Sequence, residues 1–390
     1  MYFPYLIMSK NKTILLLLEW YDYRFHSGVA QAAYKYGYNI LCPRHPDITK
    51  MDNFDPLEFI GCVTLCQRND TVENLARKKV PIIELGHIPY PRPIHRVLPD
   101  NRIIGELAAD HLMEHGYKHI ITINHDGRKM YKERIEALQR TLEECDGSVQ
   151  MTQSKNVDEC FINELKTFAI NRKNQGIHKP CASFACSDLL GSDIISALLS
   201  LEYRVPNDFV VLGVDNDVLL QESLPIKMSS IDTNPEGIGY KAIELLDEVL
   251  KSNKPLDKDD ITYVKPKGVI CRQSTSIFNI DNKVVSDALN WIHRNFHRGI
   301  QASNIAEALE VSQQGLQKLF FEHHERTPGQ EIRYQRVRAV ASLLRQTNVN
   351  LLEISKSCGF TNVDTMIVNF RNEMGVTPGR YRSQFIVSNH

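Results

Sequence analysis

Short apolar runs alternate with segments of helical periodicity through the first two thirds of the chain. The apolar runs lie at residues 13–18, 60–65, 80–85, 119–123, 182–186, 209–214 and 228–231, and the helical segments at 25–36, 103–115, 132–142, 161–170, 189–201 and 235–250. Apolar strands that alternate with helices are typical of parallel α/β sheets buried on both faces. Because the pattern continues for more than 250 residues, we expect two lobes with a shared cleft at the carboxyl ends of the strands.

The last third of the chain is predicted to be all-α and to contain a repeat. Ile305-Ala306 and Thr327-Pro328-Gly329 are matched by Ile354-Ser355 and Thr377-Pro378-Gly379 after offsets of 49 and 50 residues. Each copy has the pattern of a helix, a short turn and a second helix. We therefore predict an α/β unit at 12–275, a linker at 276–282 and an all-α domain at 283–390, with helix-turn-helix motifs at about 303–323 and 351–373. A connecting helix over 332–346 would place two recognition helices in successive major grooves of one DNA duplex.

Composition excludes several classes of protein. The 390 residues are 42% hydrophobic and 24% charged with a net charge of -1, which fits neither a disordered chain nor a fibre. An apolar run long enough to cross a bilayer is missing from the sequence, so we expect no membrane partner. Nine scattered cysteines without a C-x-x-C spacing, together with an N-terminus unlike a signal peptide, favour a reduced, cytoplasmic protein.

Polar and aromatic side chains follow the ends of several predicted strands. Trp20, Tyr21 and Asp22 follow the first strand, Asp188 follows 182–186, and Asp215-Asn216 follow 209–214. Carboxylates and amides at one sheet edge can bind the hydroxyls of a sugar or polyol, while aromatic rings cover its apolar faces. The alternative for each polar residue is that it caps the helix that follows it.

Other motifs carry little weight. Residues 237–242 match the dinucleotide fingerprint G-x-G-x-x-A, but they lie inside a predicted helix instead of before it. His111 and His115 share a helix face, which we interpret as a solvated face in preference to a structural zinc site, and His293 and His297 are interpreted in the same way. The sequence contains neither a Gly-x-Ser-x-Gly elbow nor a phosphate loop. We expect no cofactor, no metal and no catalytic residue, and therefore not an enzyme.

The repeat resembles a known family of transcription regulators. Residues 354–360, Phe370-Arg371 and residues 375–382 are similar to the AraC/XylS signature, and with the first copy the likeness covers 283–382. Residues 12–275 resemble the LacI-type sugar-sensing fold, itself similar to periplasmic sugar-binding proteins. The likeness is carried by residues 21–22, 28–29, 100–101, 133–134, 187–188, 213–216, 229–230 and 239–240.

This resemblance implies a dimeric, cytoplasmic, sugar-responsive regulator that binds a double-stranded DNA operator. We expect an activator of pentose utilisation that responds to a pentose such as xylose and has RNA polymerase as a further partner. Arg134 joins Asp188, Asp215 and Asn216 as a candidate for hydroxyl recognition, with Trp20, Tyr21 and Asp22 completing the site. A transport-type sugar-binding protein and a sugar-modifying enzyme of the same α/β fold remain the alternatives.

The candidate DNA contacts share exposed helix faces. In the first copy they are Gln313, Gln314, Gln317 and Lys318, opposite Leu316, Leu319 and Phe320; in the second they are Asn362, Asp364, Thr365, Val368 and Arg371. The second copy departs from the family pattern because Met366 replaces an aromatic residue and Ile367-Val368 replace polar ones. We therefore expect the second copy to contribute positioning, or apolar contacts with thymine methyl groups, more than hydrogen-bonded readout.

Overall fold

Two sheets followed by a bundle of helices make up the part of the chain that the computed structural model describes, which is residues 12–43, 59–125, 127–154, 159–174, 180–252, 256–278, 280, 282–324 and 326–383. The contacts divide the chain into two units. Unit 1 contains Met1–Asp100 and Asn234–Pro266, and unit 2 contains Asn101–Thr233 and Lys267–His390. The predicted fold class, a two-lobed α/β region followed by an all-α region with two helix-turn-helix motifs, is confirmed.

The sheet of unit 1 is entirely parallel and has the order β11-β5-β4-β3-β1-β2. Its strands are β1 (Thr13–Leu18), β2 (Asn39–Leu41), β3 (Gly61–Leu65), β4 (Ile82–Glu84), β5 (His95–Pro99) and β11 (Asp260–Val264). Its helices are α1 (Tyr23–Tyr36), α2 (Asn69–Arg77) and α8 (Pro235–Ser252). All six residues of β1 are buried, as expected for a strand with helices on both faces of its sheet.

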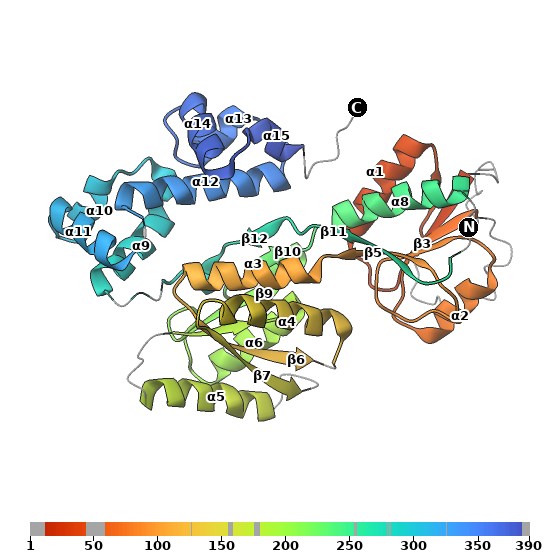
Figure 1. The fold of residues 1–390 in the computed structure, drawn as a ribbon, viewed down its shortest axis with the longest axis horizontal. Helices are drawn as coiled ribbons and strands as arrows, with labels where there is room; N and C mark the ends of the chain where they lie inside the picture. The colour runs from red at the N-terminus through yellow and green to blue at the C-terminus, as the bar shows by residue number, and fades with distance from the viewer. Residues whose placement is uncertain are drawn as a thin grey trace. The chain divides into compact units, whose positions relative to one another are not determined.

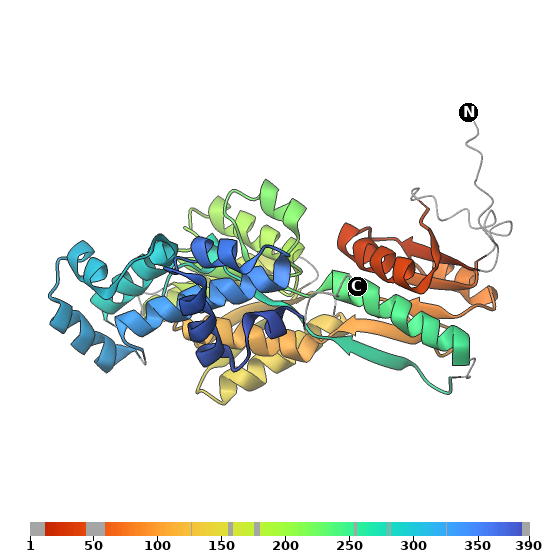
Figure 2. The same ribbon diagram turned by 90° about the horizontal axis from the view of Figure 1, so that it is seen from above.

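Helices α1 and α8 lie side by side in unit 1, drawn in red and green (Figures 1 and 2). Glycines allow this close approach. A Cβ atom at Gly28 would lie 1.9 Å from the carbonyl oxygen of Glu236, and one at Gly239 would lie 2.2 Å from that of Phe25. Gly239 belongs to the G-x-G-x-x-A sequence, and α8 starts at Pro235, so helix packing accounts for the motif without a dinucleotide.

The sheet of unit 2 repeats this strand order as β12-β10-β9-β8-β6-β7, except that β12 runs antiparallel to β10. Its strands are β6 (His119–His125), β7 (Ser148–Ser154), β8 (Cys181–Phe184), β9 (Phe209–Val214), β10 (Ser229–Asp232) and β12 (Gly268–Ile270). The helices of this α/β part are α3 (Asn101–Glu114), α4 (Lys129–Glu143), α5 (Glu159–Asn174), α6 (Asp188–Ser200) and α7 (Val218–Ser223).

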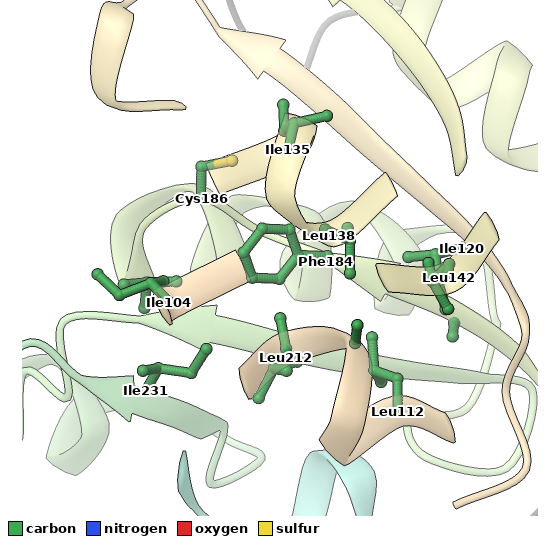
Figure 3. Packing of buried hydrophobic residues seen from close by; sticks show 14 of the residues in the cluster. Ile104, Leu112, Ile120, Ile135, Leu138, Leu142, Phe184, Cys186, Leu212 and Ile231 are labelled. Atoms are coloured by element: carbon green, nitrogen blue, oxygen red, sulfur yellow. The ribbon is translucent and has the colours of Figure 1, made fainter. Parts of the chain in front are cut away.

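Alternating side chains of β9 enter two different cores, one on each face of this sheet. Leu212 packs with residues of α3 and α4, such as Ile104 and Leu138, around Phe184 (Figure 3). Phe209 packs on the opposite face with residues of α5 and α6. This period of two explains why the strand is apolar throughout.

The remaining helices of unit 2 form the predicted all-α region. They are α9 (Lys283–Asn295), α10 (Ala302–Ala308), α11 (Gln313–His323), α12 (Pro328–Gln346), α13 (Leu351–Ser357), α14 (Val363–Met374) and α15 (Pro378–Arg382), with a short 3-10 turn at Phe296–Arg298. The long helix α12 connects α10 and α11 to the group α13–α15 (Figure 1). Thr327 and Gln330 form a capping box at its start, so α12 begins four residues before the expected 332.

Several short elements were missed by the sequence interpretation. The strands β2, β5, β7, β11 and β12 and the helices α2 and α7 were not predicted. In β11 and β7, polar residues interrupt the apolar pattern, as in DITYV and SVQMTQS. Both strands lie at or beside a sheet edge, where one face or side is less covered and an apolar run is not required.

Candidate functional site

Three polar strand ends meet at the carboxyl edge of the unit 2 sheet. Asp188 follows β8, Asp215 and Asn216 follow β9, and Asp232 ends β10, and these strands are neighbours. The hydroxyl of Ser230 donates to Asp188 Oδ1 at 2.6 Å and accepts from the backbone N–H of Asn216 at 2.9 Å. The side-chain amide of Asn216 donates to Asp232 Oδ2 at 3.0 Å. The structure thus brings two of the predicted site residues, Asp188 and Asn216, into one hydrogen-bonded group.

Asp188 is the most deeply buried carboxyl of this group, with 1% of its surface exposed. Burial raises the pKa of Asp188 to about 7, and the negative charge of Asp215 contributes to the rise. The backbone N–H of Asp217 donates to Asp188 Oδ2 at 2.8 Å. Near neutral pH the carboxyl group can therefore change its protonation state, so it can serve a hydroxyl group as acceptor or as donor.

Arg272 is a member of this group that the sequence interpretation missed. Its Nη2 donates to Asn216 Oδ1 at 2.5 Å, and its Nη1 donates to the carbonyl of Met228 at 2.9 Å. It lies some 56 residues after Asn216 and follows β12, so the rule of polar strand ends does not find it. Asp232 was also missed, although the same rule could have found it at the end of the 228–231 run.

Arg134 is buried and bonded to protein groups. Its Nε donates to Asn101 Oδ1 at 2.9 Å, and its Nη1 donates to the carbonyl of Cys186 at 2.5 Å. Asn101 in turn donates to Glu133 at 2.9 Å. Arg134 therefore fixes the chain between β8 and Asp188, and its predicted contact with a sugar hydroxyl remains a prediction.

Trp20, Tyr21 and Asp22 belong to unit 1 and follow β1. The side chains of Trp20 and Tyr21 are 55% and 60% exposed, and the Tyr21 hydroxyl bonds with His26 Nδ1 at 3.1 Å. Asp22 caps α1 through the backbone N–H of Arg24 and forms an ion pair with its guanidinium at 2.7 Å. Asp22 therefore caps α1, and its predicted contact with a sugar remains a prediction, whereas the two aromatic rings present open surfaces.

Each helix-turn-helix motif presents an exposed polar face on its second helix. In α11, Gln313, Gln314, Gln317 and Lys318 are exposed, whereas Leu316 and Phe320 are fully buried. In α14, Asp364, Thr365, Val368 and Arg371 are exposed, and Met366 and Phe370 are fully buried. Asn362 precedes α14 and caps it by accepting from the N–H of Thr365 at 2.8 Å.

The interpretation of His111 and His115 as a solvated face is wrong. Their side chains are 1% and 2% exposed, and His115 stacks on Phe278 with ring centroids 4.3 Å apart. His293, half-buried, contacts the same pair of rings, whereas His297 is exposed as expected. The segment before α9 covers the end of α3, a long-range contact that helical periodicity does not reveal.

Two further kinds of feature are not found in the described part of the chain. A group of three or more His, Cys, Asp or Glu side chains able to hold a metal ion is not found among them. No helix in the described ranges is long and apolar enough to cross a membrane.

Comparison with known proteins supports the predicted fold of both the α/β part and the helical part of the chain. The family "Periplasmic binding protein-like domain" matches residues 109–275, and the family "Helix-turn-helix domain" matches residues 305–384. A xylose operon regulatory protein from Haemophilus influenzae is 25% identical over 347 residues, which cover 85% of this chain and 87% of that protein. Its counterpart in Escherichia coli K12 is 27% identical over 322 residues, covering 79% and 80%.

A solved structure has the same fold along almost the whole chain. The "xylose-binding transcription activator xylR" matches with a TM-score of 0.54 and 23% identity and covers 96% of this chain and 98% of its own. The match covers both α/β units and the helical region, so the predicted combination of the two folds in one chain is confirmed.

Proposed function

We propose that this chain, a homologue of the xylose operon regulatory proteins, is a sugar-responsive transcription regulator that binds DNA through its two helix-turn-helix motifs. The observation that carries the proposal is the presence of two different sites in one chain. A hydrogen-bonded group of carboxylates and amides lies at a sheet edge, and two exposed helix faces lie on a shared connector, α12. Sequence-specific DNA binding needs the second site, and a response to a polar small molecule needs the first.

The proposed effector is a pentose, with D-xylose as the first candidate because the relatives regulate xylose operons. Asp188, Asp215 and Asn216 would bind its hydroxyl groups, and Arg134 is kept as a further candidate. Trp20 and Tyr21 of unit 1 would stack on the apolar faces of the ring, and Asp22 stays in the proposed site. The sugar changes the equilibrium between two conformations only if it binds one of them more tightly.

The proposal also includes the residues on the two recognition helices and the setting of the protein. Gln313, Gln314, Gln317 and Lys318 would contact one major groove, and Asn362, Asp364, Thr365, Val368 and Arg371 the next. We further propose that the protein is a cytoplasmic homodimer that activates transcription and contacts RNA polymerase. Light scattering on the purified protein tests the dimer, and a monomer at micromolar concentration would contradict it.

Thermal unfolding with and without D-xylose tests the sugar response. A ligand present at 100 times its dissociation constant stabilises the folded state by ~2.7 kcal/mol, so the melting temperature should rise. If no pentose or hexose raises the melting temperature of the folded protein, the sugar assignment is wrong. If the sugars are converted into products, a sugar-modifying enzyme replaces the proposal.

Asp215→Asn tests the sugar site itself. Asp215 has a φ of 112°, where alanine would add backbone strain, so asparagine is the cleaner substitution. Loss of the carboxylate should weaken sugar binding by ~1–3 kcal/mol. The matched control is Asp146→Asn, since Asp146 is exposed and also has a positive φ of 56°. Equal sugar affinity in the two variants would remove Asp215 from the site.

A further inference from the structure

The segment Cys271–Phe278 connects β12 to the helical region, and its first residues contact the proposed sugar site. Arg272 donates to the side-chain oxygen of Asn216 at 2.5 Å. Its backbone N–H donates to Ser229 Oγ at 2.8 Å, at the start of β10. The guanidinium also lies close enough to Asp188 and Asp232 to be attracted by both carboxylates. Arg272 is therefore bonded directly to a candidate sugar-binding residue.

Two residues in the middle of this connecting segment, Ser274 and Thr275, are buried and hydrogen-bonded. The Ser274 hydroxyl donates to the carbonyl of Val211 in β9 at 2.5 Å. Thr275 Oγ1 shares hydrogen bonds with Ser229 Oγ at 2.7 Å and with His111 Nε2 of α3 at 2.9 Å. Both Ser274 and Thr275 are at most 1% exposed. Because these residues are closely packed, a displacement of Arg272 would also displace the residues that follow it in the segment.

The last residue of the segment lies inside the core of the first helix-turn-helix motif. Phe278 packs in one cluster with residues of α9 and with Leu316 and Phe320, the buried face of α11. Its ring also stacks on His115, the residue that follows α3. The segment thus contacts Asn216 through Arg272 near its start and shares a core with the recognition helix α11 at its end.

A second contact holds the helical region to the same helix α3. Glu114, the last residue of α3, accepts hydrogen bonds from Tyr334 at 2.5 Å and from the guanidinium of Arg338, both in α12. His111 ties α3 to Thr275 one turn earlier. The connecting segment and α3 therefore contact α11 and α12 together, and a shift of the segment would act on both helices.

We infer that Arg272 is the positioning residue through which occupation of the sugar site changes the placement of the recognition helices. This inference rests on the proposed function. A sugar hydroxyl that bonds with Asn216 competes with Arg272 for the same amide group. A guanidinium without that partner must find another, so the bound and free states favour different positions of the connecting segment. Such a difference couples the two sites, and the coupling must be reciprocal.

The experiment measures coupling in both directions in the full-length protein. The DNA is a duplex selected from a random-sequence library by the wild-type protein with and without D-xylose. DNA affinity is measured with and without saturating D-xylose, and D-xylose affinity with and without the duplex. In the wild type the two ratios should be equal and lie at about 5- to 150-fold, the usual range of allosteric factors.

Arg272→Gln should reduce both ratios to below about 2-fold, because the affinity for one ligand then no longer depends on the presence of the other. The matched control is Arg204→Gln, because Arg204 lies in the same unit and pairs with Asp208 on an exposed surface; its ratios should equal those of the wild type. A merely structural role for Arg272 would lower the melting temperature and both affinities without bringing the ratios to unity.

Thr275→Val supplies an independent variant of the same segment, since it keeps the side-chain shape and loses the bonds to Ser229 and His111. It should lower both ratios at least 3-fold, and it decides the question if Arg272→Gln does not fold. Wild-type ratios in a folded Arg272→Gln or Thr275→Val variant overturn the inference and leave the proposed function intact. A wild-type protein that binds neither D-xylose nor any other pentose overturns both.

Discussion

The two helix-turn-helix motifs share one scaffold but differ in what lies behind it. The second helix of each motif carries a fully buried phenylalanine, Phe320 in α11 and Phe370 in α14, and the two positions are 50 residues apart. The first core continues through α9 to Phe278, which stacks on His115 of the α/β region. The second core closes around Tyr381 of α15 and the far half of α12. The first copy therefore shares its core with the segment that follows β12, whereas the second copy has a core of its own.

The exposed faces of the two motifs differ as well. The first offers three glutamines, whose amides can pair with base edges, and the second offers an apolar Val368 between Thr365 and Arg371. The two copies of the fold therefore differ in the chemistry of the surface that would face DNA. This difference leads to predictions in which matched substitutions in the two motifs have different outcomes.

The largest expected effect on stability comes from truncating one buried phenylalanine in the core of each motif. Phe320→Ala and Phe370→Ala should each destabilise their motif by ~3–5 kcal/mol, since both side chains are fully buried. Because the first core is continuous with Phe278, Phe320→Ala should also lower the unfolding temperature of the α/β part, and Phe370→Ala should not. Scanning calorimetry of the full-length variants checks this. Identical changes in the α/β transition would contradict the contrast between the two cores.

The next prediction uses the histidine behind the first motif. Burial lowers the pKa of His115 to about 3, and the charge of Arg338 and the neighbouring His293 act in the same direction, while Glu331 and the carbonyl of His111 oppose it. The unfolded chain takes up a proton near pH 6.5, and the folded chain does not. The free energy of unfolding should therefore be constant above pH 6.5 and fall by ~2 kcal/mol between pH 6.5 and pH 5 for this residue alone.

Urea unfolding at several pH values measures this effect, with two variants for comparison. His115→Phe keeps an aromatic ring against Phe278 and removes the titrating group, so the fall below pH 6.5 should become shallower by about one proton. His297→Phe is the matched control because His297 is exposed, and its pH dependence should equal that of the wild type. An unchanged slope in His115→Phe would mean that another group causes the acid sensitivity.

The sequence predicted most of the scaffold because its signals are local. The buried strand β9 was placed at its observed ends, 209–214, and the helix stop at Gly37 has the positive φ of 73° expected for a glycine cap. Thr-Pro-Gly at 327–329 and 377–379 identified the repeat, and the structure places it at the starts of α12 and α15. These features depend on residues within one turn or one strand.

The candidate site was only partly predictable because its remaining parts are contacts between distant segments. Asp188, Asp215 and Asn216 were found because neighbouring parallel strands end at one edge. Arg272 reaches Asn216 from a segment with no strand-end signal, and the burial of His111 depends on Thr275, 164 residues away. A helical period identifies a face, and only the fold decides whether water or another segment covers it.

A smaller effect should separate base readout from phosphate contact. Gln317→Ala should relax the preference for one base by ~1–3 kcal/mol, since a glutamine amide can bond adenine with two hydrogen bonds. Arg371→Ala should weaken binding to all sequences about equally and reduce the salt slope by about one. Gel-shift titrations at three salt concentrations, with matched and scrambled duplexes, compare the two. Loss of base preference in Arg371→Ala would assign readout to the second motif instead.

The smallest expected effect belongs to Val368, the apolar residue on the exposed face of α14. Its side chain is 57% exposed, so Val368→Ala should change the free energy of unfolding by less than about 0.5 kcal/mol.

If the valine contacts a thymine methyl group, the variant should lose less than about 1 kcal/mol of preference at one base step, with the salt slope unchanged. Duplexes with thymine replaced by uracil, which lacks only the methyl group, should weaken wild-type binding at that step and leave Val368→Ala unaffected. The control is Val349→Ala, because Val349 is 37% exposed in the turn before α13, and it should respond to uracil as the wild type does. Equal responses of all three proteins would show that the second motif positions the protein without reading a methyl group.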